Sequence, residues 1–559
     1  MTGSDRETTR APDTLPAMTA ASRAVLLAAF SIAAMLVGAE LMITAVALPA
    51  IINDIAGWTE LRRASWIING YLLAYIAAMP LAGRAADRYG LPRLLIGGLG
   101  IFAAGSLLAG AAQGLDWLIA ARVLQGFGGG TVVPLATAGA GYLYEGHARS
   151  RALGLVGAAT FLGMALGPFV GAFILTGFEL GPTFAATGQA TSAAAAVLTP
   201  AWRWVFYLGA PLAMVVAVIV WAATPSWRAA HGRGRLDVPG AILFTTALAA
   251  GLLALTWLGT DAGPGGNGVV IAATVALVAG VAAIVRFLRT PDPFIDLRAF
   301  ANRVFSSAAL VSLLTGYALA TAIVGAAVFV DRVRYGGPGD QQVALGALAG
   351  AMAIGALVSG FIVRRLGIVP VSVAGLLLGA GGLAVLATAT PATPLAAYAG
   401  GLALFGLGFG LSVTPRSTAA MEALGRAAYG TAAAAVTVAR MLGMGVGLAI
   451  LTGFGSNRIE ALSVVLTDQA ARDAVLPLDL QGRPLQDPFV VDALEAWAAG
   501  EAAHILAGLM AVAAAVMVVA IVPALSMRRT TPSSAESASS TIGPDERAAA
   551  GDDEPALAI

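Results

Sequence analysis

The stretch Gly83-Arg-Ala-Ala-Asp-Arg-Tyr-Gly90 places a compact polar turn between two long apolar runs. A similar but less complete stretch, Gly360-Phe-Ile-Val-Arg-Arg-Leu-Gly367, lies between two later apolar runs. Both of its glycines are offset from those of the first stretch by the same number of residues, because 360 − 83 = 277 and 367 − 90 = 277. Glycines at these positions allow close backbone approach and a sharp reversal of the chain. A duplicated polar turn in an apolar chain predicts two related membrane halves.

The composition sets the class of protein. Hydrophobic residues make up 58% of the 559 residues and charged residues only 11%, which is too little charge for a water-soluble domain of this length. The chain has no cysteine, which excludes disulfides and thiolate metal sites. The net charge of +1 gives no reason to expect a nucleic-acid partner. The composition therefore indicates a polytopic membrane protein.

Fourteen apolar runs are long enough to cross a bilayer, which takes about 20 residues each. They lie at 24–52, 65–85, 93–113, 117–144, 150–178, 203–223, 238–258, 268–288, 304–330, 342–363, 368–389, 395–421, 427–454 and 502–526. We therefore predict an all-α integral membrane protein. Arginines gather in the short connections on one side of the membrane. This asymmetry predicts that this side and both termini face the cytoplasm, with the chain in a bacterial inner membrane.

The repeat also divides the chain. We predict a cytoplasmic N-terminal segment (1–23), a six-helix bundle (24–224), two linker helices (237–288), a second six-helix bundle (304–526) and a disordered cytoplasmic tail (527–559). Residues 179–200 have the composition of a flexible loop. An extracytoplasmic segment, 456–501, contains a candidate turn at Gln481-Gly482 and a helical pattern from Phe489 to Trp497, so it is either a solvated loop or a packed cap.

Further motif pairs keep the register of the repeat. Gly126-Phe-Gly-Gly-Gly-Thr-Val-Val-Pro134 is similar to Gly408-Phe-Gly-Leu-Ser-Val-Thr-Pro415, and Leu162-Gly163-Met164 is similar to Leu442-Gly443-Met444, with 443 − 163 = 280. Chance matches in a glycine-rich chain could explain one pair but not three. Internal repeats of this kind are typical of secondary transporters, whose substrate site lies at the repeat interface.

The polar turn predicts a conformational latch. Asp87 lies at a helix end, where it can cap the next helix or pair with an arginine, and such a contact can break and reform as two bundles rock. A solvated turn is the alternative. The copy has lost the acid, because Arg364 stands where Asp87 would. The predicted latch residues are Gly83, Asp87, Arg88, Gly90, Arg364 and Arg365.

Only three charges, Glu40, Arg122 and Arg440, are expected well inside the hydrocarbon layer. Each costs on the order of 2.5–3.5 kcal/mol at the bilayer centre, so each should face a partner or a cavity. Glu40 is the candidate proton-coupling group, and either arginine could be its partner. The alternative is a static Glu–Arg pair that only locks helices together.

Gly163, Gly167 and Gly171 recur every four residues and share one helical face, beside Pro168. We expect this stripe to lie where the two halves meet and slide, or to be ordinary small-residue packing. The three histidines are scattered, no phosphate-binding glycine loop is present, and no nucleophile stands beside a base. We therefore expect no metal, no cofactor and no enzymatic activity.

The motifs resemble those of the major facilitator superfamily, in its fourteen-helix drug:proton antiporter branch. Gly83-x-x-x-Asp87-Arg88-x-Gly90 matches the loop motif of that superfamily, and Arg122-Val-Leu-Gln-Gly126 matches its fourth-helix motif. Gly163-Met-Ala-Leu-Gly167-Pro168-Phe-Val-Gly171 is similar to the antiporter motif. The resemblance implies two six-helix bundles with two extra helices inserted between them, proton-coupled alternating access, and a monomer.

A narrower resemblance is to actinobacterial triacylglyceride exporters that work with a periplasmic lipoprotein. It rests on Trp66-Ile-Ile-Asn-Gly-Tyr-Leu-Leu-Ala-Tyr-Ile-Ala-Ala-Met-Pro80, on Val438-Ala-Arg440-Met, and on the long segment 456–501. This chain departs from that family at Phe161, where an acidic residue would face Arg440. The resemblance implies export of hydrophobic or amphipathic compounds, with lipids favoured. The alternatives are a multidrug:proton antiporter without a lipid role and a non-transporting membrane sensor.

Overall fold

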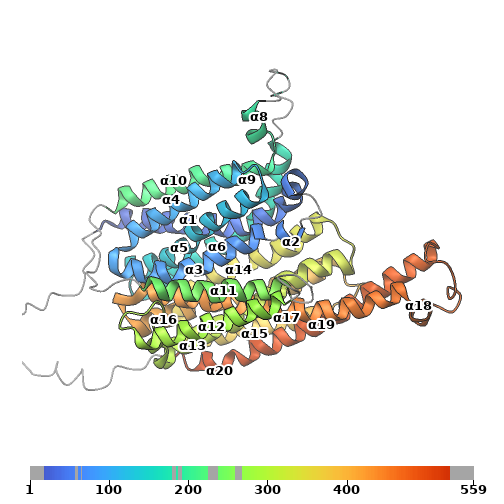
Figure 1. Ribbon diagram of the computed structural model, residues 1–559. Helices are drawn as coiled ribbons and strands as arrows, with labels where there is room; N and C mark the ends of the chain where they lie inside the picture. Colours follow the sequence, from blue (N-terminus) through green and yellow to red (C-terminus); the bar gives the residue numbers. More distant parts are fainter. Residues whose placement is uncertain are drawn as a thin grey trace, which may run out of the picture. The chain divides into compact units, whose positions relative to one another are not determined.

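The structure is a computed structural model that describes residues 18–56, 61–64, 66–178, 184, 186, 192–224, 237–257 and 267–528. Every regular element in these ranges is helical (Figure 1). Thirteen of the described helices are long and apolar enough to cross a membrane, and α11 adds a shorter apolar helix. The predicted all-α architecture agrees with this arrangement. The predictions for residues 1–17, for half of the 179–200 loop and for the tail beyond Arg528 lie outside the described residues.

The first six long helices pack on one another and are called the N-terminal half. Helix α1 packs along α6, α3 along α5, and α4 along both α5 and α10. Their bounds are α1 Ala20–Ile51, α3 Trp66–Tyr89, α4 Leu91–Gly110, α5 Leu115–Leu143, α6 Gly146–Gly177 and α10 Gly209–Ala223. Shorter elements join them, namely η1 Ile52–Ala56, α2 Leu61–Ala64, α8 Ala193–Leu198 and α9 Trp202–Tyr207.

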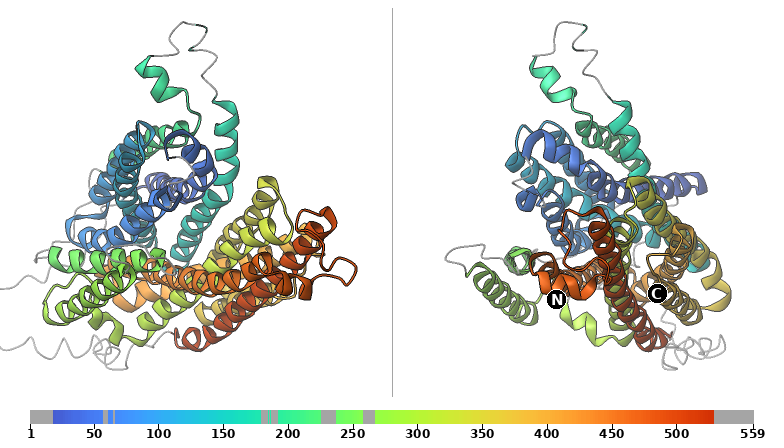
Figure 2. Two further views of the ribbon diagram at one scale, coloured as in Figure 1. Left: turned by 45° about the vertical axis from the view of Figure 1, so that its right-hand side comes forward. Right: turned by 90° about the vertical axis from the view of Figure 1, so that its right-hand side faces the viewer.

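The last six long helices form a second group, called the C-terminal half, with a matching pattern. Helix α13 packs along α17, α14 along α16, and α15 along both α16 and α19. Their bounds are α13 Arg303–Val328, α14 Pro338–Leu366, α15 Ile368–Leu386, α16 Leu395–Leu424, α17 Tyr429–Thr467 and α19 Pro488–Val519. The shorter elements are η4 Leu297–Ala301, η5 Phe329–Val333, η6 Arg426–Ala428, α18 Gln469–Val475 and α20 Ile521–Leu525. Figure 2 shows the two groups in blue to teal and in yellow to red.

Glycine contacts show that the halves repeat each other in their packing. A Cβ atom on Gly163 of α6 would lie 2.0 Å from the carbonyl oxygen of Met35 on α1, and one on Gly443 of α17 would lie 1.8 Å from that of Leu313 on α13. The offsets are 443 − 163 = 280 and 313 − 35 = 278. Both helix pairs therefore approach so closely that only glycine fits, at equivalent positions.

The pairing of the fourth-helix motifs is corrected in detail. A Cβ atom on Gly128 would lie 2.3 Å from the amide nitrogen of Phe102, and one on Gly408 would lie 2.2 Å from that of Gly379. The offsets, 408 − 128 = 280 and 379 − 102 = 277, make Gly408 the counterpart of Gly128. Aligning the motifs by their shared Gly-Phe start places Gly408 two residues out of register, because both motifs contain several glycines.

Helices α11 (Val238–Trp257) and α12 (Gly268–Arg289) follow the N-terminal half and precede the C-terminal half in the sequence. They pack on each other. Asp237 joins them at one end, because its carboxylate accepts a hydrogen bond from Arg286 at 2.6 Å and others from the amides of Gly240 and Phe294 at 3.0 Å each. Burial alone would raise the pKa of Asp237, but these three donors lower the pKa below its usual value.

The segment 456–501 is a packed helical extension rather than a solvated loop. Helix α17 continues to Thr467 and α19 begins at Pro488, so both run past the other helices (Figure 1). The predicted turn is present, with Gly482 at φ +73°, and so is the predicted helix from Phe489 to Trp497. Val465, Leu476, Leu480, Val490 and Leu494 form a small buried cluster between these helices.

Candidate functional site

Glu40 pairs with Arg122 in the interior of the N-terminal half. The Arg122 Nη1 donates to Glu40 Oε1 at 2.7 Å, and the side chains are only 1% and 3% exposed. Thr44, one turn along α1, donates its hydroxyl to the same carboxylate at 3.2 Å. Of the two partners that the sequence left open for Glu40, the structure therefore brings Arg122 to it.

A polar network on three helices holds Arg122 in place. Its Nε donates to the carbonyl oxygen of Ile67 at 3.1 Å, and its Nη1 also donates to Gln125 at 2.5 Å. Gln125 in turn donates to Ser106 on α4 at 2.6 Å. The guanidinium lies 4.1 Å from the ring centre of Tyr71, a favourable cation–π geometry. Because Ile67 and Gln125 also accept hydrogen bonds from it, Arg122 keeps partners even when Glu40 is protonated.

Asp87 joins the two halves. Its carboxylate accepts hydrogen bonds from the amides of Gly430 and Thr431 at 2.8 Å each, and from the Thr431 hydroxyl at 2.7 Å. These amides belong to the first turn of α17, so Asp87 at the end of α3 caps a helix of the other half. The Tyr142 hydroxyl donates to the same carboxylate at 3.2 Å. Asp87 therefore does cap a helix N-terminus, but it is that of α17 in the other half and not that of the next helix, which the sequence pattern predicted.

The latch glycines behave as predicted. Gly90 has φ +94°, which lets α4 start directly after α3 ends. A Cβ atom on Gly83 would lie 2.6 Å from the carbonyl oxygen of Gly430, so α3 and α17 meet backbone to backbone. Gly360, the counterpart of Gly83 in the C-terminal half, makes an equivalent contact. A Cβ atom on Gly360 of α14 would lie 2.8 Å from the carbonyl oxygen of Ser150 on α6. We call this end of the protein the latch end.

Arg88, Arg364 and Arg365 form no ion pair among the described residues. Arg364 and Arg365 are exposed in the last turn of α14, where positive charge complements the helix dipole. The ion pair that does cross between the halves at the latch end, Arg426 with Glu145, is one the sequence did not single out. The rings of Tyr142 and Tyr429 also contact each other at this end, with centres 5.1 Å apart and planes tilted by 45°.

The glycine stripe of α6 does not lie between the halves. Gly163 and Gly167 pack on the backbone of α1, and Gly171 lies 3.5 Å from Ile43 of the same helix. The expected sliding surface is therefore wrong, because the stripe fixes two helices of one half. The face of α6 that meets the C-terminal half carries Gly154 and Phe161 instead, against Gly360 and Phe409.

A cavity of about 40 Å³ lies between the halves, and two arginines of the C-terminal half line it. Arg440 of α17 was expected inside the membrane, but Arg416 of α16, which is only 1% exposed, was not. Arg416 is therefore a further buried charge on a long apolar helix, and the sequence analysis did not name it. Arg416 stands six residues inside the apolar run 395–421, directly after Pro415, and a count of distance from the run's end would have found it.

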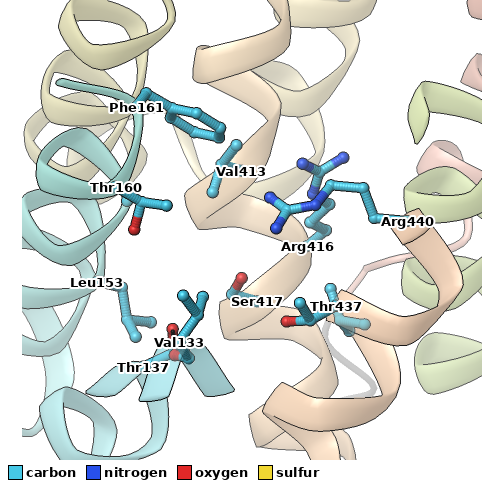
Figure 3. A pocket seen from close by; sticks show the side chains of 12 residues that line it. Val133, Thr137, Leu153, Thr160, Phe161, Val413, Arg416, Ser417, Thr437 and Arg440 are labelled. Carbon is cyan, nitrogen blue, oxygen red and sulfur yellow. Dashed lines mark hydrogen bonds between the residues drawn. The ribbon is translucent and has the colours of Figure 1, made fainter. Parts of the chain in front are cut away.

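Figure 3 shows the cavity side chains. The polar ones besides the arginines are Thr137, Thr160, Ser417 and Thr437. The apolar ones are Val133, Leu153, Phe161, Val413 and Val436. The described residues hold no cluster of three side chains that could bind a metal.

Comparison with known proteins gives the family and the fold. The model of the Major Facilitator Superfamily matches residues 30–448. A triacylglyceride transporter of Mycolicibacterium hassiacum is 33% identical over 481 residues, covering 82% of this chain and 84% of that protein. A triacylglyceride transporter of Mycobacterium tuberculosis is also 33% identical, covering 79% and 84%.

Two solved structures have the same fold at low sequence identity. A bacterial homologue of the human lysosomal transporter Spinster, in an inward-facing and unoccupied conformation, is 18% identical with a TM-score of 0.56 and covers 92% of this chain and 99% of its own. A proton:xylose symporter bound to a bromodeoxyglucose is 12% identical with a TM-score of 0.55, covering 89% and 95%.

Proposed function

The chain belongs to the major facilitator superfamily, and from this premise we propose that it is a proton-coupled exporter of lipids and other hydrophobic or amphipathic compounds. The observation that carries the proposal is the similarity over more than three quarters of both chains to proteins named triacylglyceride transporters. Triacylglyceride-like lipids are therefore the favoured substrates.

The packed extension of α17, α18 and α19 supports a lipid substrate over a small drug. A lipid with acyl chains must stay out of water as it leaves the bilayer, and a built structure past the membrane can shield it. The extension has a buried apolar cluster and also presents exposed apolar side chains, Leu478 at 87% and Phe489 at 66%. We place it on the outer side, where a periplasmic lipoprotein could receive the lipid.

Alternating access would use the latch. Asp87, Gly83 and the Arg426–Glu145 pair hold the halves together at one end, which we place in the cytoplasm together with both termini. Breaking these contacts would let the halves rock open toward the cytoplasm and close at the other end. The cavity of about 40 Å³ has room for only a few waters, so a lipid requires a more open state than this one.

Glu40 is the proposed proton carrier. When it is ionised, its charge is matched by Arg122 at 2.7 Å. When it takes up a proton, the pair loses its Coulomb attraction, while Arg122 keeps Gln125 and Ile67 as acceptors. The two protonation states can thus favour different arrangements of α1 against α5, and a proton entering the cell can drive substrate outward.

Reconstitution into liposomes tests the function. Labelled triacylglyceride and a cationic dye are offered to the same vesicles, with and without a proton gradient. We expect gradient-dependent movement of the lipid. Movement of the dye alone would favour the multidrug antiporter, and movement of neither under any gradient would favour a membrane sensor and overturn the proposal.

A further inference from the structure

Arg416 and Arg440 line the central cavity without an acidic partner among the described residues. Arg416 donates to the hydroxyl of Thr315, which is neutral. The buried Nε of Arg440 has no hydrogen-bond partner in the part of the chain that the structure describes. The equivalent place in the N-terminal half carries no charge, since 440 − 280 = 160 is a threonine and 416 − 280 = 136 is an alanine.

These two cations are also close enough to repel each other, and Figure 3 shows their guanidinium groups in the same part of the cavity. An unpaired charge buried in a protein is costly, and two like charges together cost more. Glu40 does not relieve them, because it is paired with Arg122 in the other half. The arrangement is therefore incomplete until an anion enters.

An aromatic ring lies beside each of the two arginines. Arg416 lies 4.9 Å from the ring centre of Phe409, and Arg440 lies 5.9 Å from that of Phe161. These rings contact each other edge to face, with centres 5.7 Å apart. Phe161 comes from the N-terminal half and Phe409 from the C-terminal half, so the cationic site is assembled across the interface between the halves.

The rest of the lining suits the head of an amphiphile. Thr137, Thr160, Ser417 and Thr437 offer hydroxyl groups, and Leu153 and Val436 continue the wall with apolar surface. Guanidinium groups bind carboxylate and phosphate oxygens with short, charge-assisted hydrogen bonds. A neutral triacylglyceride has no group that could neutralise either arginine.

We propose that this cavity binds the oxyanion head group, carboxylate or phosphate, of a lipid amphiphile through Arg416 and Arg440. The inference rests on the proposed export function, because it takes the cavity to be part of the substrate pathway. Among the hydrophobic and amphipathic compounds proposed for export, it adds acyl lipids with a negative head group as ligands of this cavity.

The test measures binding of matched probes to the full chain in nanodiscs. Radiolabelled oleate at pH 8 is compared with methyl oleate, which has the same chain and no charge, and with oleyl phosphate. We expect both anions to bind at least tenfold more tightly than the ester. Equal binding of oleate and methyl oleate would overturn the inference, as would displacement of oleate by acetate or inorganic phosphate at equal concentration, which would mean a free-anion site.

Variants connect this preference to the cavity. Arg416→Gln and Arg440→Gln should each lower oleate affinity about tenfold without changing methyl oleate binding. Arg289→Gln, exposed in the last turn of α12, is the control and should change neither. Phe161→Glu places a carboxylate beside Arg440 and should also abolish the preference, whereas Phe161→Gln should keep it. Thermal melting checks that each variant is folded. If folded variants of both arginines still bind oleate more tightly than methyl oleate, the proposal is overturned.

The same preparations separate this inference from the proposed function. Triacylglyceride transport in liposomes with no anion preference in binding would overturn the inference and leave the export function standing. Oleate preference without transport of any lipid would support the anion site and count against export.

Discussion

The carboxylate of Glu40 and the guanidinium of Arg122 lie 2.7 Å apart on α1 and α5, with both side chains almost fully buried. No other pair in the described part of the chain has both charges so deeply enclosed. A buried ion pair is poor evidence for stability, because the cost of removing two charges from water offsets their attraction. A role in transport explains its presence better.

Glu40→Gln should abolish proton-driven transport while leaving the protein folded. Glutamine keeps the hydrogen-bonding shape but cannot carry a proton, so we expect gradient-driven lipid transport in liposomes to fall by at least tenfold. Asp116→Asn, which removes the exposed partner of Arg63, is the matched control and should transport normally. Normal gradient-driven transport by Glu40→Gln would exclude Glu40 as the coupling group.

Asp87→Ala should weaken the closed state at the latch end. The substitution removes three hydrogen bonds from the first turn of α17, and losing a helix cap costs about 0.5–2 kcal/mol. Because the chain has no cysteine, a single Ser417→Cys in the cavity reports opening by its rate of maleimide labelling. We expect Asp87→Ala to make labelling from the latch end several-fold faster, and Arg364→Ala to leave the rate unchanged. An unchanged labelling rate in Asp87→Ala would argue against the latch.

Gly443→Ala should destabilise the protein and Gly445→Ala should not. The new methyl group at 443 would lie 1.8 Å from the carbonyl oxygen of Leu313, whereas nothing lies within 4 Å at 445. Overpacking of this kind costs about 1–3 kcal/mol, and alanine in an open helix position gains up to about 1 kcal/mol over glycine. Melting temperatures in detergent measure the difference. Equal losses for both variants would contradict the close packing of α13 and α17.

Asp237→Asn should loosen the junction of α11 and α12 in a pH-dependent way. The pKa of Asp237 is lowered in the folded protein, so its stabilisation is complete above the usual value and is lost as the pH falls through the lowered pKa, below about pH 4. We expect a local loss of about 1–3 kcal/mol, limited by the 36% exposure of Arg286. Hydrogen exchange of residues 238–257 measures it, and wild type and variant should converge in acid. A difference between wild type and variant that does not shrink as the pH falls below about 4 would rule out the charge as its cause.

Val490→Asp should unfold the extension without harming the bundle. Val490 is fully buried among Leu476, Leu480 and Leu494, so a carboxylate there breaks the cluster. We expect faster proteolysis between residues 468 and 487 and slower delivery of lipid to the outside. Leu478→Asp, at a side chain 87% exposed, is the control. Undiminished lipid export from a proteolysed extension would remove it from the export route.

Much of this arrangement follows from local patterns in the sequence. The length of each apolar run predicts a spanning helix. The 277- and 280-residue offsets predict that Gly163 and Gly443 are equivalent positions, and each makes the same kind of close contact within its own half. The turn at Gly90 also follows, because it depends on a glycine at a helix end, whereas the helix that Asp87 caps lies more than 340 residues away and was not predicted.

What the sequence did not reveal depends on contacts between distant segments. Periodicity shows that Gly163, Gly167 and Gly171 share a face, but not that α1 rather than the other half covers it. The choice of Arg122 over Arg440 for Glu40 depends on how α1 and α5 pack, and 82 residues separate the two side chains. Arg416 was overlooked because an apolar run hides a single charge near its end.

Phe161 faces Arg440 with an uncharged ring, so the charge of Arg440 is left for an anionic substrate. Export of an anion would then depend on the membrane voltage. If one proton enters for each anion that leaves, both movements carry positive charge inward. A cell interior that is negative by 100 mV then contributes about 2.3 kcal/mol for each of the two charges. Such a cycle would be electrogenic, and export would continue on the electrical potential alone after the pH difference across the membrane has collapsed.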